Sequence, residues 1–170
     1  FSNGGVMIDG MVWTAKVEPN YSGDKILLGD VIAKGADRKL ITEDFYISED
    51  TLPKWEYLKG AKHEMRKSKD GFEFSYNEGA MVFPDPLDKP SRTIITSEGG
   101  ATASRFKHVI KDPVNGRLRR LIPLELERLN MFPDNHTVGE SDSKRAFFMG
   151  NALVCGIVTK VGQEIIARMG

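Results

Sequence analysis

The chain has 170 residues, of which 40% are hydrophobic and 28% are charged. That length suits one compact domain or two small lobes, and the composition is that of a globular protein and excludes a disordered chain. Lysine plus arginine equals aspartate plus glutamate at 24 residues each, so the zero net charge gives no indication of a nucleic-acid partner.

Turn-forming residue pairs between short apolar runs predict three β-hairpins. The pairs and the runs beside them are Asp9-Gly10 between 6–8 and 11–13, Asp70-Gly71 before 72–76, and Asn115-Gly116 between 106–110 and 117–121. Aspartate or asparagine followed by glycine suits the left-handed conformations of a tight turn, so the flanking runs are predicted to pair antiparallel. The strict alternation of apolar and polar residues at 72–76 is typical of a half-buried strand.

Other short apolar runs lie between the first two hairpins. Residues 25–33 predict either a strand or the start of a helix, and residues 45–47 predict a strand. Ser48 is expected to cap a helix over 49–59 that Gly60 ends. Its buried face is expected to hold Leu52, Trp55 and Leu58, with Pro53 in the first turn.

The local charge is less balanced than the total. Residues 101–120 contain six lysines and arginines against Asp112 alone, and residues 54–69 are also basic. Such stretches can hold a protein on nucleic-acid phosphates. A solvated surface explains them equally well.

The segment from Arg119 to Asp134 predicts a short helix with clear ends. Pro123 suits the first turn, where its missing N–H costs nothing, and Glu125 interacts favourably with the positive helix end. Pro133 ends the helix because the residue before a proline is disfavoured in the α region. Four leucines supply apolar faces, and three arginines remain to pair with the two glutamates or with an external anion: Leu121, Leu124, Leu126, Leu129, Arg119, Arg120 and Arg128.

Residues 135–144 predict a polar loop and residues 151–168 a helix, for which Asn151 is a candidate N-cap. Cys155 lies on its apolar side and is expected to be a buried structural thiol. As the single cysteine, it excludes an internal disulfide and a cysteine zinc framework. No stretch is expected to be long and apolar enough to span a membrane, and the first residues lack the pattern of a signal peptide.

Two segments resemble motifs of the DNA cytosine-5 methyltransferases. The ninth motif of that family is matched by Arg119, Leu121, Pro123, Glu125, Arg128, Leu129, Phe132 and Pro133. Ile122 and Leu124 replace its usual threonine and arginine. The tenth motif is matched by Phe148-Met149-Gly150-Asn151-Ala152-Leu153-Val154. Two motifs in the right order are specific, and the resemblance extends from about residue 85 to the C-terminus.

The resemblance implies chemistry that this chain does not itself contain. In the family, a cysteine thiolate in a Pro-Cys motif attacks the base at C6, a glutamate in Glu-Asn-Val assists, and a glycine-rich loop opens the cofactor site. None of these motifs is present, and Cys155 follows Val154. The chain is therefore expected to be the C-terminal portion of a bacterial restriction–modification enzyme, to hold no catalytic residue and to be inactive alone.

The family's target-recognition region lies just before the ninth motif and has a Thr-Leu or Thr-Ile pair followed by a glycine-containing loop. The residues that fit this pattern, with the basic and hydroxyl side chains near them, are the predicted DNA-binding residues Arg92, Thr93, Ile94, Ser97, Gly99, Gly100, Arg105 and Lys107. Glycine lets a backbone approach DNA closely, although a tight turn explains both glycines as well. The sequence does not sort phosphate contacts from base contacts.

The resemblance assigns roles to the two motifs as well. Arg119, Glu125, Arg128, Phe132 and Pro133 are expected to be structural residues of the ninth motif. Asn151 and Ala152 are expected to line the S-adenosyl-L-methionine site, where many members have serine in place of Ala152. The three histidines have no ligand partner at metal-binding spacing, so no metal site is assigned.

The expected fold is α+β. A small strand-rich target-recognition lobe over 1–118 precedes the motif IX helix and loop at 119–139. Residues 140–170 then return to a Rossmann-like S-adenosylmethionine-dependent methyltransferase domain, most of which is absent from this chain.

The expected partners are double-stranded DNA and the N-terminal catalytic portion of the same enzyme, or a separate catalytic subunit. The expected setting is the bacterial cytoplasm, with no membrane. The alternatives are a non-enzymatic DNA-binding module derived from a methyltransferase, and a structural domain with no DNA role.

Overall fold

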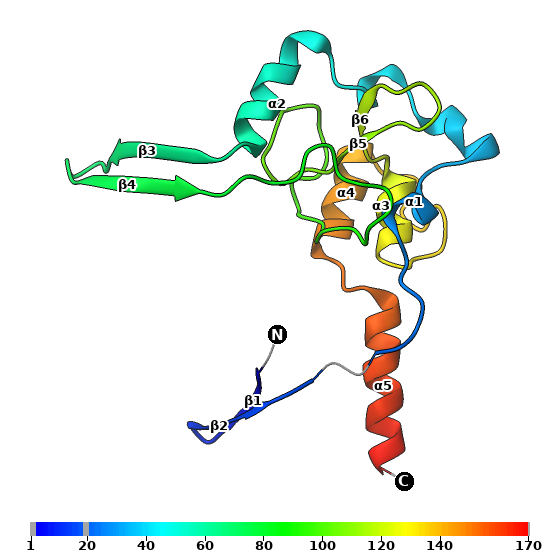
Figure 1. Ribbon diagram of the computed structural model, residues 1–170. Coiled ribbons are helices and arrows are strands. Elements are labelled where there is room, and N and C mark those ends of the chain that lie inside the picture. The colour runs from blue at the N-terminus through cyan, green and yellow to red at the C-terminus, as the bar shows by residue number, and fades with distance from the viewer. Residues whose placement is uncertain (1–2, 19–20, 170) are drawn as a thin grey trace.

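The computed structural model describes residues 3–18 and 21–169 (Figure 1). Its strands are β1 (Asn3–Ile8), β2 (Met11–Lys16), β3 (Lys62–Lys67), β4 (Glu73–Glu78), β5 (Val109–Lys111) and β6 (Leu118–Arg120). Its α-helices are α1 (Leu28–Val31), α2 (Leu52–Lys59), α3 (Pro123–Leu129), α4 (Asp142–Asn151) and α5 (Cys155–Met169). Three 3₁₀ turns, η1 (Gly35–Leu40), η2 (Glu43–Phe45) and η3 (Glu49–Thr51), lie between α1 and α2. The mixture of helices and strands confirms the expected α+β class. Each sheet in the described residues has only two strands.

All three predicted hairpins are present and antiparallel. β1 pairs with β2, β3 with β4, and β5 with β6. The glycine of each turn adopts positive φ as predicted, at 77° for Gly10, 85° for Gly71 and 72° for Gly116, and Asp9 does so at 49°. These turns depend on local backbone chemistry alone, which is why the sequence identifies them.

Two strand predictions were wrong. β4 does contain the alternating run, but most of it is exposed, as is Phe72 beside it at 69%, because the body contacts the β3–β4 hairpin only near its base. Residues 45–47 form the end of η2 and a single isolated bridge from Tyr46 to Arg119, not a strand. The 3₁₀ turn instead directs Phe45 into the core, where it is buried.

The predicted helix at 49–59 is confirmed as η3 followed by α2. Trp55 is fully buried, whereas Leu52 and Leu58 are half-buried. Pro53 lies in the first turn and Gly60 caps the C-terminus, as expected. The Ser48 side chain caps no backbone N–H; its hydroxyl contacts the Thr51 hydroxyl at 3.2 Å. Residues 25–33 resolve as the short helix α1.

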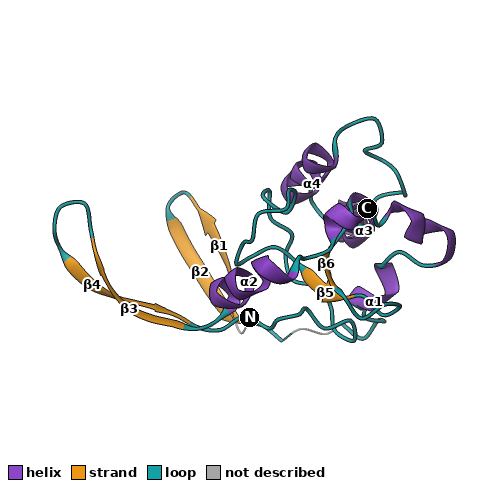
Figure 2. Cartoon of the chain, turned by 90° about the horizontal axis from the view of Figure 1, so that it is seen from above, coloured by secondary structure: helices purple, strands orange, loops and turns teal. Residues whose placement is uncertain are grey.

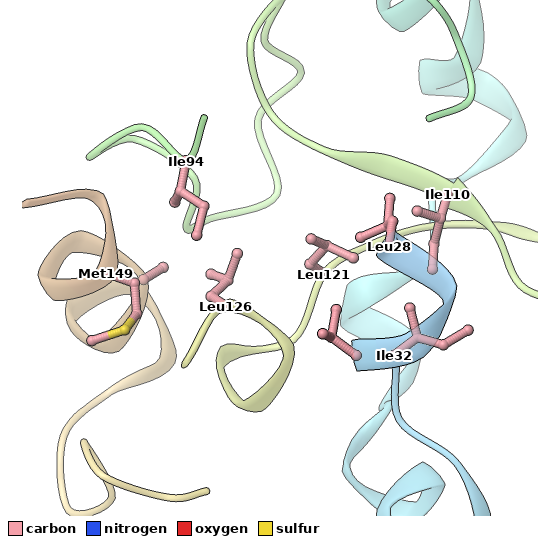
Figure 3. Close-up of a cluster of buried hydrophobic side chains, with 9 residues drawn as sticks. Leu28, Ile32, Ile94, Ile110, Leu121, Leu126 and Met149 are labelled. Carbon is pink, nitrogen blue, oxygen red and sulfur yellow. The ribbon is translucent and has the colours of Figure 1, made fainter. Parts of the chain in front are cut away.

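One apolar core joins segments that are far apart in the sequence (Figure 3). Its buried side chains come from α1, the 91–108 loop, β5, the ninth-motif segment and α4: Leu28, Val31, Ile32, Ile94, Ile110, Leu121, Leu126, Ala146 and Met149. A smaller cluster contains Ala33, Phe45, Ile122 and Leu124. The leucines of the ninth-motif segment therefore serve both clusters.

The C-terminal segment differs from its prediction. A helix was expected to start at Asn151, but α4 already begins at Asp142, because Ser141 caps it by accepting a hydrogen bond from the Lys144 N–H. Asn151 is the last residue of α4, and its side-chain amide donates to the Phe147 carbonyl at 2.9 Å, so it is not an N-cap. Cys155 is half-buried at the start of α5, not buried as expected.

α5 and the β1–β2 hairpin extend away from the body (Figure 1), and both expose apolar side chains. α5 has no buried residue and exposes Ile157, Val161 and Ile165 along one side. β1 and β2 expose apolar side chains on both faces of their hairpin, Trp13 among them.

The expectation that no stretch is long and apolar enough to cross a membrane was wrong, because one helical segment has the required length and composition. Within the described residues, one helical segment, Asp142–Met169, contains an 18-residue window with a mean hydropathy of 1.2. Residues 152–154 interrupt it between α4 and α5. α4 packs on the core through Met149, so the uncovered apolar surface belongs to α5.

Candidate nucleic-acid interface

Residues 91–108, which contain all the predicted DNA-binding residues, form an irregular loop between the cis peptide bond at Phe83-Pro84 and β5. Arg92 fixes where this loop starts and ends. Its guanidinium pairs with Asp85 at 2.6 Å and donates to the Phe106 carbonyl at 3.1 Å. Asp85 also accepts from the Val109 N–H at 2.9 Å. Burial raises the pKa of the Asp85 carboxyl group, but Arg92 and the Val109 N–H outweigh burial and hold that pKa below its ordinary value.

Arg105 and Lys107 hold the far end of the loop. Arg105 donates to the Leu58 carbonyl at 3.1 Å and pairs with Glu78 at 3.0 Å. The Lys107 ammonium is buried and donates to the carbonyls of Gly100 at 2.9 Å and Thr102 at 2.8 Å. Both cations are therefore engaged within the chain.

Lys59 of α2 also binds the backbone of this loop. Its ammonium donates to the carbonyls of Lys107 at 2.6 Å and Arg105 at 3.1 Å. Burial lowers the pKa of Lys59 to about 8. The buried charge satisfies backbone carbonyls that would otherwise lack donors, as buried polar groups require.

Ser91, His108 and Glu98 form a buried hydrogen-bonded chain across the middle of the loop. Sequence analysis missed it. The Ser91 hydroxyl lies 3.0 Å from His108 Nε2, and His108 Nδ1 lies 2.7 Å from Glu98 Oε1. Glu98 Oε1 also accepts from the His108 N–H at 2.5 Å, while Glu98 Oε2 has no partner among the described residues. His108 is completely buried, so the geometry suits holding the loop closed. Positions 91, 98 and 108 follow no spacing rule that a sequence could reveal.

The remaining predicted residues of the loop differ in how far they are buried. Thr93, Ser97 and Gly100 are exposed, and Gly100 has φ of 77°. Ile94 is buried in the core. A methyl group added to Gly99 would lie 2.8 Å from Ser143 Cα, so this glycine permits close approach to α4. DNA contact by the predicted loop residues stays a prediction.

The ninth-motif segment is built around Arg119, whose side chain is completely buried. Its two terminal nitrogens donate to the two carboxylate oxygens of Glu125, both at 2.8 Å, and its Nε donates to Asp112 at 2.8 Å. Glu125 also accepts from the backbone N–H groups of Ala33 at 2.8 Å and Ile122 at 2.9 Å. This cluster joins the segment after α1 to β6 and α3.

The positive and negative side chains of this cluster are paired with one another. Burial raises the pKa of Asp112, but the Val114 N–H, Arg38 and Arg119 together lower it to about 2. Burial lowers the pKa of Arg119, but Glu125 and Asp112 raise it above its ordinary value. Arg119 therefore stays charged without contact with solvent.

The other predicted residues of the ninth motif lie at the end of α3. Arg128 pairs with Asp37 at 2.7 Å and with Asp134 at 2.5 Å. Phe132, which precedes Pro133, packs on the core and stacks on His136 with ring centroids 4.9 Å apart. α3 ends at Leu129, before Pro133, because Asn130 leaves the helical conformation.

The tenth-motif segment lies against the 91–108 loop. A methyl group added to Gly150 would lie 2.4 Å from backbone atoms of Ile95 and Thr96, so α4 and the loop are in direct backbone contact. A cleft of about 870 Å³ opens beside this contact, between the 90–94 segment, the end of α3 and residues 149–161. Ala152 lines the cleft, whereas Asn151 is exposed outside it.

The described residues hold no group of three or more His, Cys, Asp and Glu that could bind a metal ion. The lining of the cleft contains Arg92 and Arg128 but no carboxylate. What the chain offers there is apolar surface, two cations and a few hydroxyl and amide groups.

Residues 9–167 match the family model described as C-5 cytosine-specific DNA methylase. The chain is 39% identical over 165 residues to the Type II methyltransferase M.Sau3AI of Staphylococcus aureus. The aligned part is 97% of this chain and 38% of that protein, so the chain spans well under half the length of this relative.

The structure is similar to that of the methyltransferase EhMeth of Entamoeba histolytica, with a TM-score of 0.55 and 12% identity. The match covers 94% of this chain and 48% of that one. At this identity the similarity concerns the fold alone.

Proposed function

Because the chain belongs to the family of C-5 cytosine-specific DNA methylases, we propose that it is the C-terminal, target-recognition portion of a bacterial restriction–modification methyltransferase. The family membership confirms the resemblance to the DNA cytosine-5 methyltransferases. The Type II methyltransferase similarity supports the restriction–modification setting, and with it the bacterial cytoplasm. The catalytic cysteine and glutamate then lie outside this chain.

The observation that carries the proposal is the contact of α4 with the 91–108 loop. Gly150, in the motif assigned to the cofactor side, touches the backbone of the loop assigned to DNA. A contact of this kind fixes the distance between the target base and the methyl donor, and such positioning is what a two-substrate transfer needs. The segments 1–118, 119–139 and 140–170 are proposed as divisions by role, since they share one core.

DNA recognition is assigned to the surface around the 91–108 loop. Thr93, Ser97 and Gly100 are its exposed predicted residues. Arg92, Arg105 and Lys107 hold the loop in shape, with contacts to the Phe106, Leu58 and Gly100 carbonyls respectively. The target cytosine must leave the helical stack, because its C5 is not accessible for chemistry inside the duplex.

The residues fit one wall of an S-adenosylmethionine site. That cofactor carries an ammonium group, and the cleft beside Ala152 holds no carboxylate to receive it. The remaining ligands are therefore expected from the catalytic portion. When bound, the cofactor supplies the methyl group. Ala152 supplies apolar surface at the break after α4, and Asn151 an exposed amide.

The catalytic portion is proposed to cover α5. Its exposed apolar side is too regular for a free surface helix, and helices of this kind normally pack against another element. The same contact explains why a segment of this length and hydropathy need not enter a membrane.

The test is to mix the chain with the catalytic portion of its own enzyme and to measure methyl transfer to a DNA library. Neither part is expected to be active alone, and the pair is expected to methylate cytosine within a short motif. A folded, stably assembled pair that methylates no DNA would contradict the proposal. Sequence-specific binding by such an inactive pair would favour the non-enzymatic DNA-binding module.

A further inference from the structure

The β3–β4 hairpin projects from the body beyond α2 (Figures 1 and 2), and the body contacts it through Tyr57 and Arg105 near its base. It pairs over six residues in each strand, from Lys62 with Glu78 to Lys67 with Glu73. An isolated two-stranded hairpin is marginally stable in water. The contacts that stabilise it are therefore of interest.

One face, the paired face, supplies such contacts. It contains Lys62, Glu64, Arg66, Phe74, Tyr76 and Glu78. Lys62 pairs with Glu78 at 2.7 Å, Arg66 pairs with Glu64 at 3.1 Å, and the Arg66 guanidinium lies 3.5 Å from the centre of the Tyr76 ring. The Tyr57 hydroxyl of α2 donates to Glu64 at 2.8 Å. These contacts stiffen the hairpin and fix its base to the body.

The opposite face, the open face, is different in kind. It contains His63, Met65, Lys67, Glu73, Ser75 and Asn77, and all six are exposed. The contacts among them are short-range: Asn77 donates to Ser75 at 3.2 Å, and Lys67 lies 3.8 Å from Glu73. Among the described residues, this face is therefore left free to meet something outside the chain.

Its chemistry indicates what that partner is. The β1–β2 hairpin exposes apolar residues, as a protein-binding surface does, whereas the open face carries amide, hydroxyl, imidazole, ammonium and carboxylate groups around one thioether. These are the groups that read base edges: Asn pairs with adenine, Lys with guanine, a carboxylate accepts from cytosine N4, and an apolar side chain meets the thymine methyl. The major groove of B-DNA admits a two-stranded β-ribbon.

Exclusion favours the same partner. Lys59 is buried, and Lys62 and Arg66 are paired within the protein. Toward the tip, Lys69 is exposed and Lys67 lies 3.8 Å from the exposed Glu73, so both ammonium groups can reach phosphates. The cations of the 91–108 loop are already engaged with carbonyls and carboxylates of the chain.

We propose that the β3–β4 hairpin enters the major groove and that its open face, chiefly Lys67, Ser75 and Asn77, determines which bases beside the target cytosine are accepted. This rests on the proposed function, because it assumes that the chain binds DNA. It assigns discrimination between DNA sequences to the β3–β4 hairpin in place of the 91–108 loop.

The experiment starts by selecting duplexes from a random DNA library with the full chain, alone and with the catalytic portion. Dissociation constants are then measured for the selected duplex and for a scrambled one. Asn77→Ala and Ser75→Ala are each expected to reduce the preference for the selected duplex by about tenfold. Lys67→Gln and Lys54→Gln form a matched pair, since each removes one exposed positive charge, the first from the open face and the second from α2.

Lys67→Gln is expected to reduce the preference, whereas Lys54→Gln is expected to leave the ratio of the two constants unchanged. Replacing purines of the selected site by 7-deazapurines, which lack the major-groove N7 acceptor, should weaken binding of the parent chain. Thermal unfolding of each variant shows that the body is intact. Unchanged preference in all three open-face variants would overturn the inference and leave the proposed function standing. No enriched duplex in either selection would overturn both.

Discussion

At the scale of single residues, Arg119 is the charge on which the body depends. It is completely buried between Glu125 and Asp112, with bonds of 2.8 Å to each. A buried charge is tolerated when it is paired, and removing one partner leaves the other uncompensated. The ninth-motif segment therefore contributes a structural centre, not a reactive group.

Glu125→Gln is expected to lower the free energy of unfolding by about 3–5 kcal/mol, because Arg119 would lose its charged partner inside the body. Urea denaturation at neutral pH measures the change. Glu43→Gln is the control, since its 2.8 Å pair with Arg117 is exposed to solvent, and it is expected to cost less than about 1 kcal/mol. Similar losses in both variants would refute the central role of the buried cluster.

Asp112 gives the cluster a dependence on pH. Its pKa is about 2 in the folded chain, below the ordinary value of 3.8. A carboxyl group whose pKa is depressed on folding stabilises the fold above its unfolded pKa, and this contribution disappears as pH falls toward the folded value. The contribution is about 2 kcal/mol at neutral pH.

Unfolding free energies measured between pH 6 and pH 2 are expected to fall most steeply below about pH 4, near the unfolded pKa of an aspartate. Asp112→Asn should be less stable than the parent at pH 6 and should approach it at the acidic end. A constant difference across the range would show that Asp112 does not titrate as the geometry requires.

The pairing of these charges was only partly accessible from the sequence. Arg119 and Glu125 lie close in the chain, and their pairing was one of two expected outcomes. Arg128 pairs with Asp37, which lies 91 residues away, and not with either glutamate. Glu127 instead accepts from Arg145 at 3.0 Å. Local patterns carry no information about partners that only the tertiary fold brings together.

At the scale of elements, the contact of α4 with the 91–108 loop depends on Gly150. Any side chain there must displace backbone atoms of Ile95 and Thr96, which would lie 2.4 Å from an added methyl group. The contact is between main chains, so no rotamer change can relieve it.

Gly150→Ala is expected to lower the free energy of unfolding by about 1–3 kcal/mol, as overpacking does, despite the better helix propensity of alanine. Gly162→Ala in α5 is the matched control, because nothing lies within 4 Å of the added methyl group. It is expected to raise stability, by up to about 1 kcal/mol. Stabilisation by both variants, seen in urea melts, would show that α4 and the loop are not in contact.

Elements with local signals were the ones that the sequence predicted correctly. Asp9-Gly10, Asp70-Gly71 and Asn115-Gly116 specify their turns by backbone preference alone, and all three hairpins are present. The wrong predictions concern segments whose structure depends on residues outside them. The strand at 45–47 has no partner beyond a single bridge, and Asn151 ends a helix that Ser141 had already begun.

At the scale of the whole molecule, the folded body is accompanied by uncovered apolar surface. Ile157, Val161 and Ile165 lie along one side of α5, and each is more than half exposed. Apolar stripes of this kind mark interaction sites or cause aggregation. The balanced composition gave no indication of this, because an average over the chain does not record where the apolar residues lie.

Val161→Glu is expected to weaken assembly with the catalytic portion by at least about tenfold, because a charge would be buried without a partner. Gln163→Glu adds the same charge on the polar side of α5 and should leave assembly unchanged. Titration calorimetry of the two purified parts measures both. If the two variants assemble equally well, α5 is not the surface that the catalytic portion covers.

The β3–β4 hairpin joins the body only at its base, and no residue between 60 and 80 belongs to either apolar core. Natural selection can therefore act on the hairpin and on the body almost independently. A lineage can inherit a changed or recombined hairpin without first acquiring mutations that restore folding, whereas a change at Arg119 or Gly150 disturbs a buried charge pair or a backbone contact. The part of the chain to which we assign recognition is then also the part that is freest to diverge among descendants.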